Sequence, residues 1–471
     1  MGSIERSWVI LAGIIVVLVI IVGLGYYLTR PPGVTPAPTT PATATPTTPI
    51  MTPTTPITTP TTPISPAPVT QVPDKIVIGF TVSLSGAYAK EGVMGLLGIQ
   101  TAVKWVNEIY GGVRIGGKRV PIEIKYYDDE SKRDLVVSLY ERLITVDKVH
   151  FLLGPYSSPL AFAAAPVAER YGMLFVNWGG ASDLINKQGY KFTVTVWSQA
   201  SKYHASTLEF LSKVDPTAKR IAILYADDEF NRMVAEGARS KAKELGLEVV
   251  FDRAFPRDIK DFTPILLELK LANPDAIVAG THFANGLLLT KQLADLRINA
   301  KLIALTVAPT VPEYYESLKI LAEGIIFPSH WEPGIKYDPE VARKMGLPFF
   351  GPTSDEFYLL FLAVSGGLQP SYHAASAAAA VILLVKAIEE AQSLDQKAVR
   401  EAFNKLDIVT FFGRFKIDPE TGYQIGHSMV LGQWQDGTKV IIWPFESATG
   451  RYYYPIPTWE EKAAGKKAVP G

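Results

Sequence analysis

The fold is decided most clearly by the stretch RIAILYADDEFNRMVAEGARSKAKELGLEVVFDRAF, residues 220–255. This stretch predicts an apolar strand at 220–225, a helix at 232–245 and a second strand at 249–255. Two strands joined through a helix pair in parallel, because a parallel pair needs a crossover connection. The stretch therefore predicts one βαβ unit.

The same alternation continues on both sides of this unit. Further strands are predicted at 75–82, 120–127, 150–153, 173–177, 194–197, 276–279 and 301–305, and further helices at 95–108, 135–147, 160–171, 262–271 and 287–296. The pattern runs twice in succession, so it predicts an α/β fold with two doubly wound parallel-sheet lobes. Each lobe is expected to have a crevice at the carboxyl ends of its strands.

The C-terminal third has a different pattern. It predicts a long Ala-rich helix at 374–391, a shorter helix at 398–406, and hairpins within 413–443 with turns at 418–422 and 435–437. These strands are too few for a third domain, so we expect the tail to complete the earlier lobes.

Composition excludes several classes of function. The 471 residues carry 46 Lys and Arg against 46 Asp and Glu, so no net charge attracts nucleic acid, and none is predicted as a partner. The sequence has no cysteine. Disulfides, thiolate zinc sites, iron–sulfur clusters and a lipid-modified cysteine are therefore all excluded.

The N-terminus predicts a membrane anchor. Residues 8–28 read WVILAGIIVVLVIIVGLGYYL without a charge, and about 20 apolar residues suit a helix that spans a bilayer. A cleaved signal peptide is the alternative, but its apolar core is usually about 7 to 15 residues long. We therefore expect residues 1–30 to be an uncleaved anchor.

A stalk is predicted next. Residues 31–73 consist almost entirely of Thr, Pro, Ala and Ile, a composition that buries too little apolar area to fold and suits an extended, O-glycosylated spacer. Such a spacer has little use in the cytoplasm. The chain is therefore expected at the cell membrane, with a single-pass anchor and its folded part outside the cell.

Signatures of catalysis are scarce. The sequence contains no phosphate-binding GxxxxGK[ST], no GxSxG and no HExxH. Its six histidines are scattered without the spacing of metal ligands. We predict that the protein is not an enzyme and has no catalytic residues, no cofactor and no metal site.

Two donor-rich turns predict a binding site instead. The turn at 154–160 (GPYSSPL) follows a strand and opens a helix, with Ser158 as the expected N-cap. The turn at 177–182 (NWGGAS) repeats this arrangement after the next strand. Free N–H groups and hydroxyls at the carboxyl ends of strands receive anions. The two turns therefore predict a carboxylate pocket.

The order of local motifs resembles that of the branched-chain amino-acid binding proteins of ABC importers, which belong to the type I periplasmic-binding (Leu/Ile/Val-binding) family. The segments that carry this resemblance are KIVIGFTVSLSGAYAKEG (75–92), YYDDESKR (126–133), LLGPYSSP (152–159), LFVNWGGAS (174–182), RIAILYADDEF (220–230), DFTPILLELKLANPDAIVAG (261–280) and FFGRFKIDPETG (411–422). The resemblance covers about residues 74–445.

The resemblance implies two lobes that are joined by a three-crossing hinge and close on a ligand. One lobe would comprise 74–197 plus 331–412, and the other 198–330 plus 413–471. A serine and backbone groups of the first lobe would hold the ligand carboxylate. Together with the two turns, the resemblance predicts these ligand-binding residues: Tyr156, Ser157, Ser158, Gly179, Gly180, Ala181, Ser182, Phe230, His282 and Phe283.

One departure from the family bears on the ligand. Amino-acid binders of this family place an acid near the ligand ammonium, whereas residues 306–309 here read TVAP. Either Glu91, Asp227, Asp228 or Glu229 supplies the charge, or the ligand is an organic acid, an amide or an aromatic acid.

The function predicted from the sequence is capture of a small carboxylate-containing solute outside the cell for an ABC importer. The solute would be an amino acid of the branched-chain type or a related organic acid or amide. The expected partners are the solute, the permease and ATPase subunits, and the membrane. The alternative is a ligand-sensing receptor ectodomain of the same fold that takes no part in transport.

Overall fold

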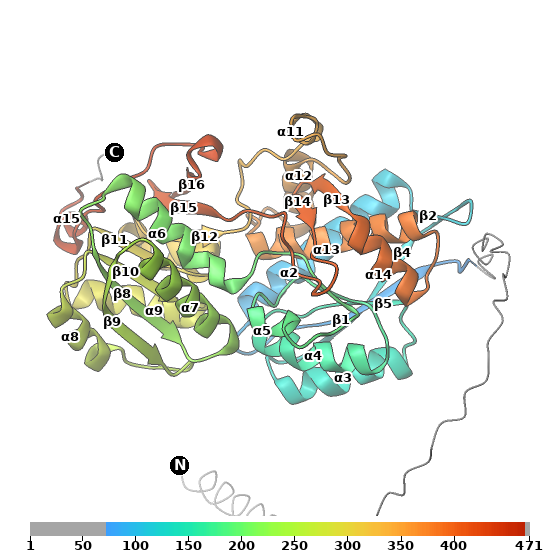
Figure 1. Ribbon diagram of the computed structural model, residues 1–471, viewed down its shortest axis with the longest axis horizontal. Helices are drawn as coiled ribbons and strands as arrows, with labels where there is room; N and C mark the ends of the chain where they lie inside the picture. The colour runs from blue at the N-terminus through green and yellow to red at the C-terminus, as the bar shows by residue number, and fades with distance from the viewer. Residues whose placement is uncertain (1–71, 467–471) are drawn as a thin grey trace, which may run out of the picture. The chain divides into compact units, whose positions relative to one another are not determined.

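The computed structural model describes residues 72–466 (Figure 1). The predicted membrane anchor at 8–28 and the predicted stalk, apart from residues 72 and 73, lie outside this range. Across the described residues, no helix has both the length and the apolar character needed to cross a membrane.

The first sheet has five parallel strands in the order β4-β1-β5-β6-β7. Its strands are β1 (Ile76–Val82), β4 (Ile122–Asp128), β5 (Phe151–Leu153), β6 (Phe175–Asn177) and β7 (Thr193–Thr195). The connecting segments hold α2 (Ala89–Lys104), the π-helix η1 (Trp105–Tyr110), the hairpin of β2 (Val113–Ile115) and β3 (Lys118–Val120), α3 (Arg133–Thr145), α4 (Ser158–Arg170) and α5 (Asp183–Asn186). Helices on both faces keep the central strands buried.

The second sheet has seven strands in the order β16-β15-β12-β11-β10-β8-β9. Its parallel strands are β8 (Arg220–Ala226), β9 (Glu248–Phe255), β10 (Ala276–Gly280), β11 (Leu302–Leu305) and β12 (Ile326–Ser329), and its antiparallel strands are β15 (Val430–Gln435) and β16 (Thr438–Trp443). Around them lie η2 (Ala200–Lys202), α6 (Tyr203–Val214), α7 (Glu229–Glu244), α8 (Thr263–Ala272), α9 (Phe283–Asp295), η3 (Ala308–Thr310), α10 (Pro312–Leu318) and η4 (Lys319–Ala322).

The C-terminal third is divided between the two sheets. Its elements are α11 (Pro339–Lys344), α12 (Ser354–Ser365), α13 (Tyr372–Ala391), α14 (Gln396–Lys405), β13 (Asp407–Thr410), β14 (Gly413–Lys416), η5 (Phe445–Ser447) and α15 (Trp459–Ala463). Helix α13 packs against α2 beside the first sheet (Figure 1), whereas β15 and β16 extend the second sheet. We call each sheet with its helices a lobe, the first and the second.

Both predicted turns reverse the chain between antiparallel segments. Residues 435–437 join β15 to β16 as expected. The turn at 418–422 also reverses the chain, because Ile417 and Gln424 pair antiparallel on either side of it, while β14 pairs back with β13. The Asp418 carboxylate accepts the N–H groups of Glu420 and Thr421 at 2.9 Å each, and this closes residues 418–422 into a local loop.

The fold class predicted from the sequence is confirmed for the described residues, since two doubly wound parallel sheets follow one another along the chain. Between residues 72 and 466 the chain passes from one sheet to the other three times, after β7, after β12 and after β14. The residue boundaries predicted for the lobes stay a prediction.

Helices α2 and α13 approach each other unusually closely. A methyl group added at Gly98 would lie 2.1 Å from the backbone oxygen of Ala374, and one added at Gly95 would lie 2.1 Å from the Trp178 ring. Only glycine fits at such contacts, and the residues of α13 around Ala374 are fully buried. The packing of α2 on α13 therefore depends on the absence of side chains at these positions.

Replacing Gly98 by alanine tests this packing. Alanine favours a helix by about 1 kcal/mol over glycine, yet we expect Gly98→Ala to lower the free energy of unfolding by about 1–3 kcal/mol, because the helices must separate. Urea unfolding measures the change. Val93→Ala, on an exposed part of α2, should stay within about 0.5 kcal/mol of the wild type. A Gly98→Ala protein as stable as the wild type would show that the helices do not touch here.

Candidate functional site

Both sheets leave a crevice at a corresponding point. The parallel strands of each have the order second-first-third-fourth-fifth along the chain, so connections leave the first and third strands in opposite directions. Ligands of doubly wound sheets bind at such a switch point, outside the carboxyl ends of the strands. The relevant loops are those after β1 and β5 in the first lobe and after β8 and β10 in the second.

A cavity lies at the carboxyl ends of both sheets, among residues that follow β5, β6 and β7 in the first lobe and β8, β10 and β11 in the second. We call it the central cavity, and it is lined by Tyr156, Ser157, Ser158, Gly179, Ala181, Trp197, Tyr203, Phe230, His282, Val307 and Tyr372. Its free volume of about 10 Å³ is the space that about one water molecule needs. Residues from both lobes therefore close around a very small space.

Seven of the ten sequence-predicted residues line the central cavity: Tyr156, Ser157, Ser158, Gly179, Ala181, Phe230 and His282. The other three do not. Gly180 is bonded to Asn177, and the Ser182 hydroxyl donates to the backbone oxygen of Glu229 at 2.7 Å. Phe283 packs with the core of the second lobe.

The first turn differs in one detail from the prediction. Helix α4 begins at Ser158, so Ser157, not Ser158, occupies the N-cap position. The Ser158 hydroxyl instead accepts the N–H groups of Ala181 and Ser182, at 3.0 Å each, which fastens the two donor-rich turns together. The Ser157 hydroxyl is buried without a hydrogen bond within the described residues.

The second turn is held by Asn177 at the end of β6. Its side chain donates to the Gly180 oxygen at 2.6 Å and accepts the Gly180 N–H at 2.8 Å. A methyl group at Gly179 would lie 2.1 Å from the backbone oxygen of Pro155. The two turns are thus in direct backbone contact, which explains why glycine occupies this position.

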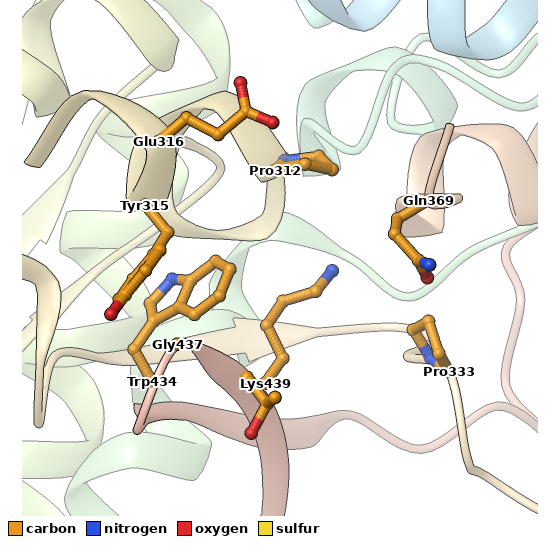
Figure 2. A pocket seen from close by; sticks show the side chains of 9 residues that line it. Pro312, Tyr315, Glu316, Pro333, Gln369, Trp434, Gly437 and Lys439 are labelled. Carbon is orange, nitrogen blue, oxygen red and sulfur yellow. The ribbon is translucent and has the colours of Figure 1, made fainter. Parts of the chain in front are cut away.

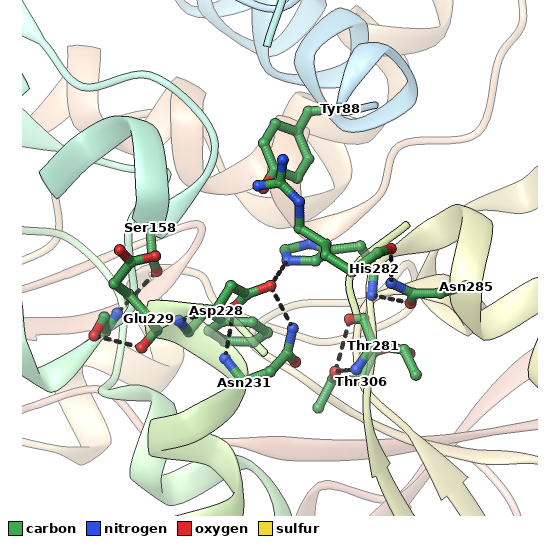
Figure 3. Close-up of polar contacts among 12 residues, drawn as sticks. Tyr88, Ser158, Asp228, Glu229, Asn231, Thr281, His282, Asn285 and Thr306 are labelled. Carbon is green, nitrogen blue, oxygen red and sulfur yellow. Dashed lines mark hydrogen bonds and ion pairs between the residues drawn. The ribbon is translucent and has the colours of Figure 1, made fainter. Parts of the chain in front are cut away.

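A chain of two hydrogen bonds joins the two lobes at the cavity, and Figure 3 shows the first of them, between His282 and Asp228. His282 Nε2 lies 3.0 Å from the Asp228 carboxylate, and His282 Nδ1 lies 3.0 Å from the Tyr156 hydroxyl. An ionised carboxylate only accepts hydrogen bonds, so Nε2 donates to Asp228. In a neutral ring Nδ1 is then the acceptor of the Tyr156 hydroxyl proton.

Asp228 also caps helix α7. Its carboxylate accepts the N–H groups of Phe230 and Asn231 and the Asn231 side-chain amide, at 2.9–3.0 Å. Burial acts to raise the pKa of Asp228, but His282 and these hydrogen bonds outweigh it and hold the pKa below the usual range. Asp228 is therefore a buried anion whose acceptor positions are already used.

Four cavity residues were not predicted from the sequence: Trp197, Tyr203, Val307 and Tyr372. Val307 follows the predicted strand 301–305, so the rule that selected the other loops would have found it, whereas Trp197 was placed inside the predicted strand 194–197 and lies after the end of β7. Tyr203 begins α6 and Tyr372 begins α13, and no local pattern marks either position.

A larger pocket of about 410 Å³ lies elsewhere (Figure 2). It is lined by Pro312, Tyr315, Glu316, Pro333, Gln369, Trp434, Gly437, Thr438 and Lys439. None of the predicted site residues contributes to it. The Trp434 Nε1–H donates to the Pro309 oxygen at 2.9 Å, and the Lys439 ammonium donates to the Thr310 oxygen at 3.1 Å. With these polar groups already bonded to backbone, the central cavity is the better candidate site.

Comparison with known proteins identifies the family. The model of the periplasmic binding protein family matches residues 75–439. The chain belongs to this family. The family resemblance predicted from the sequence is thereby confirmed.

Individual relatives are distant but similar over most of their length. The "Leu/Ile/Val-binding protein homolog 7" of Brucella suis is 25% identical over 391 residues, which are 81% of this chain and 94% of the relative. Two solved structures share the fold. One is the branched-chain amino acid transporter substrate binding protein of Streptococcus pneumoniae in complex with isoleucine (TM-score 0.65, 22% identity, 78% of this chain and 97% of that one). The other is an ABC transporter solute binding protein of R. palustris in complex with 4-hydroxybenzoate (TM-score 0.65, 22% identity, 78% and 95%).

The Asp228–His282 pair gives a pH-dependent prediction for this family member. In Asp228→Asn, the remaining side-chain oxygen can still cap α7. The new NH₂ group, however, faces the N–H donors of His282 and Asn231, where it cannot accept a hydrogen bond. We expect Asp228→Asn to lower the free energy of unfolding at pH 7 by about 1–3 kcal/mol. The pKa of Asp228 is lowered in the folded state, so its stabilisation exists above the ordinary aspartate pKa and is lost as pH falls below about 4.

Urea unfolding at pH 7 and in steps down to pH 3 measures this difference, which should shrink as pH falls. Asp227→Asn is the matched control, since Asp227 is exposed and pairs with Arg232 on the surface. It should change stability by no more than about 1 kcal/mol. Equal effects of the two substitutions would contradict the buried pair.

Proposed function

We propose that this protein captures a small carboxylate-containing solute between its two lobes and delivers it to the permease of an ABC importer. The observation that carries the proposal is the central cavity, because loops at the carboxyl ends of both sheets meet there and both lobes supply its walls. A ligand enclosed in this way is bound by two bodies that move relative to each other. Binding is then coupled to closure.

The first lobe offers the groups that suit a carboxylate. Helix α4 begins at the cavity with the positive end of its dipole, and the hydroxyl of Ser157 is buried there without a hydrogen bond of its own. The N–H groups of Ala181 and Ser182, which now bond to Ser158, lie in the adjacent turn. Donors of this kind are the usual anion receptors at the start of a helix.

Closure is supported by the contact between Tyr156 and His282. This hydrogen bond joins the loop after β5 to the loop after β10. The cavity that it closes is far too small for an amino acid, so the lobes must part for a ligand to enter. Three connections between the sheets provide the hinge for such a movement.

The solute that we propose is an amino acid of the branched-chain type or a related organic or aromatic acid. The relatives bind both kinds, since one solved structure holds isoleucine and another holds 4-hydroxybenzoate. The walls formed by Trp197, Tyr203 and Tyr372 suit an apolar side chain or a ring equally.

Transport also requires that the protein stay near its permease and the ATPase subunits that drive it. We propose that the apolar segment 8–28 anchors the chain in the cell membrane and that residues 31–73 act as the stalk, with the binding lobes outside the cell. The alternative, a sensory ectodomain of the same fold, has the same cavity. The relatives named as ABC transporter proteins favour transport.

A ligand screen tests the proposed function. Thermal unfolding of the purified chain is measured with amino acids, organic acids, amides and aromatic acids. A ligand present at 100 times its dissociation constant adds about 2.7 kcal/mol to the free energy of unfolding. If no carboxylate solute raises the unfolding temperature, the proposal is wrong.

Ser157→Ala then tests the site with the solute found in the screen. The Ser157 hydroxyl makes no hydrogen bond within the described residues, so its removal should leave stability unchanged. We expect affinity to fall about 10-fold or more, because a hydrogen bond to a charged group is lost. Isothermal titration calorimetry measures the affinity. Ser138→Ala, an exposed substitution of the same kind on α3, should bind like the wild type; equal affinity in all three proteins would place the carboxylate elsewhere.

A further inference from the structure

One buried carboxylate forms no ion pair with a lysine or arginine within the described residues. Burial raises its pKa, and His282 lies close enough to lower it in part. Glu91, in the first turn of α2, has no exposed surface. One of its oxygens lies 3.3 Å from the backbone N–H of Phe283, and the other has no hydrogen-bond partner. An unpaired buried carboxylate is strongly unfavourable, so proteins normally neutralise it or give it a cation.

Glu91 differs from the other glutamates that have a buried oxygen without a hydrogen bond, because those form ion pairs. Across residues 72–466, four glutamates have a buried oxygen without a hydrogen bond: Glu91, Glu229, Glu313 and Glu332. The last three each pair with a basic side chain, which is Arg133, Lys90 or Lys439 respectively. Glu91 forms no ion pair with a basic side chain in the described part of the chain.

Glu91 lies beside the central cavity. Phe283, whose N–H it accepts, directly follows the cavity residue His282. Burial raises the pKa of the cavity residues Tyr156 and Tyr372, and the charge of Glu91 adds to the rise in both. The carboxylate is therefore close enough to two walls of the cavity to act on them electrostatically.

The other acids near the site are already paired. Asp228 binds His282 and caps α7, and Asp227 pairs with Arg232 on the surface. Glu229 pairs with Arg133. Of the four acids near the predicted pocket, Glu91 alone within the described residues retains an unused oxygen and no basic partner.

We infer that Glu91 is the partner of a cationic ammonium group on the ligand, which makes the ligand an amino carboxylate. This inference rests on the proposed function, because it assumes that the ligand carboxylate binds the turns of the first lobe. Glu91 then replaces the acid that residues 306–309 lack. The first lobe then holds both ends of the ligand, the carboxylate through the N–H groups and hydroxyl at the start of α4 and the ammonium group through Glu91.

The chemistry of the two groups is complementary. An ammonium group has three hydrogen-bond donors, and one carboxylate oxygen of Glu91 accepts no hydrogen bond within the described residues. Burial raises the pKa of Glu91 above its ordinary value, and a bound cation offsets that penalty. The tyrosine rings of Tyr156 and Tyr372 add attraction for a cation near their faces.

Matched pairs of ligands test the inference. Each pair consists of an amino acid and its 2-hydroxy analogue, such as leucine with 2-hydroxy-4-methylpentanoate and phenylalanine with 3-phenyllactate. The two members have the same carboxylate and side chain, and only one has a charge for Glu91. We expect the wild-type protein to bind the amino acid at least about 30-fold more tightly in calorimetric titrations.

Glu91→Gln identifies the residue responsible. Glutamine keeps the shape and removes the charge, so we expect the amino acid to lose at least about 30-fold in affinity and its hydroxy analogue to lose little. A purely structural role of Glu91 would weaken both ligands equally. Glu313→Gln is the matched control, since Glu313 influences Glu91 electrostatically but pairs with Lys90; it should preserve the preference of the wild type.

The outcomes separate this inference from the proposed function. Tighter binding of hydroxy or simple acids by the wild type would overturn the role of Glu91 and leave solute capture intact. An unchanged amino-acid preference in Glu91→Gln would do the same. If no carboxylate solute of the screen binds the wild type, both are overturned. The wild-type comparison needs no variant, so a preference for the hydroxy analogues overturns the inference even if Glu91→Gln does not fold.

Discussion

Parallel pairing imposes one direction on the neighbouring strands of each lobe, and the position of the candidate site follows from that constraint. The five parallel strands of each lobe have their carboxyl ends along a single edge, and the loops that leave this edge are brought together. Tyr156, His282 and Phe230 come from three such loops, far apart in the sequence. Hydrogen bonds such as Tyr156–His282 adjust the contact between the lobes, but strand direction is what makes the contact available.

Two buried acids at this edge illustrate how structural and functional charges differ. Asp228 receives four hydrogen bonds from its own lobe, so its charge is fully used in holding α7 and His282 in place. Glu91 receives one long hydrogen bond from the opposite lobe. A buried carboxylate therefore stabilises the fold at Asp228, whereas at Glu91 it keeps an oxygen that accepts no hydrogen bond within the described residues.

The sequence predicted the fold class because apolar strands and amphipathic helices alternate with little ambiguity, as residues 220–255 show. It also located most of the cavity, since Ser158, Gly179 and His282 each follow a predicted strand. It missed Tyr372, which begins a helix 175 residues beyond Trp197 in the chain. Tertiary packing alone brings that tyrosine to the cavity. The N-cap was displaced by one residue because the Ser158 hydroxyl holds the neighbouring turn, a contact that no local pattern encodes.

The glycines of α2 affect how much conformational entropy the protein loses when it binds a ligand. Gly92, Gly95 and Gly98 recur every three residues and let the helix lie against other backbone and a tryptophan ring without intervening side chains. Glu91 lies on this helix, and Tyr372 begins the helix packed against it. Because α2 and α13 pack this closely, they cannot slide past each other, and Glu91 and Tyr372 keep a fixed spacing before a ligand binds. Recognition then loses less conformational entropy, because this part of the receptor is preorganised.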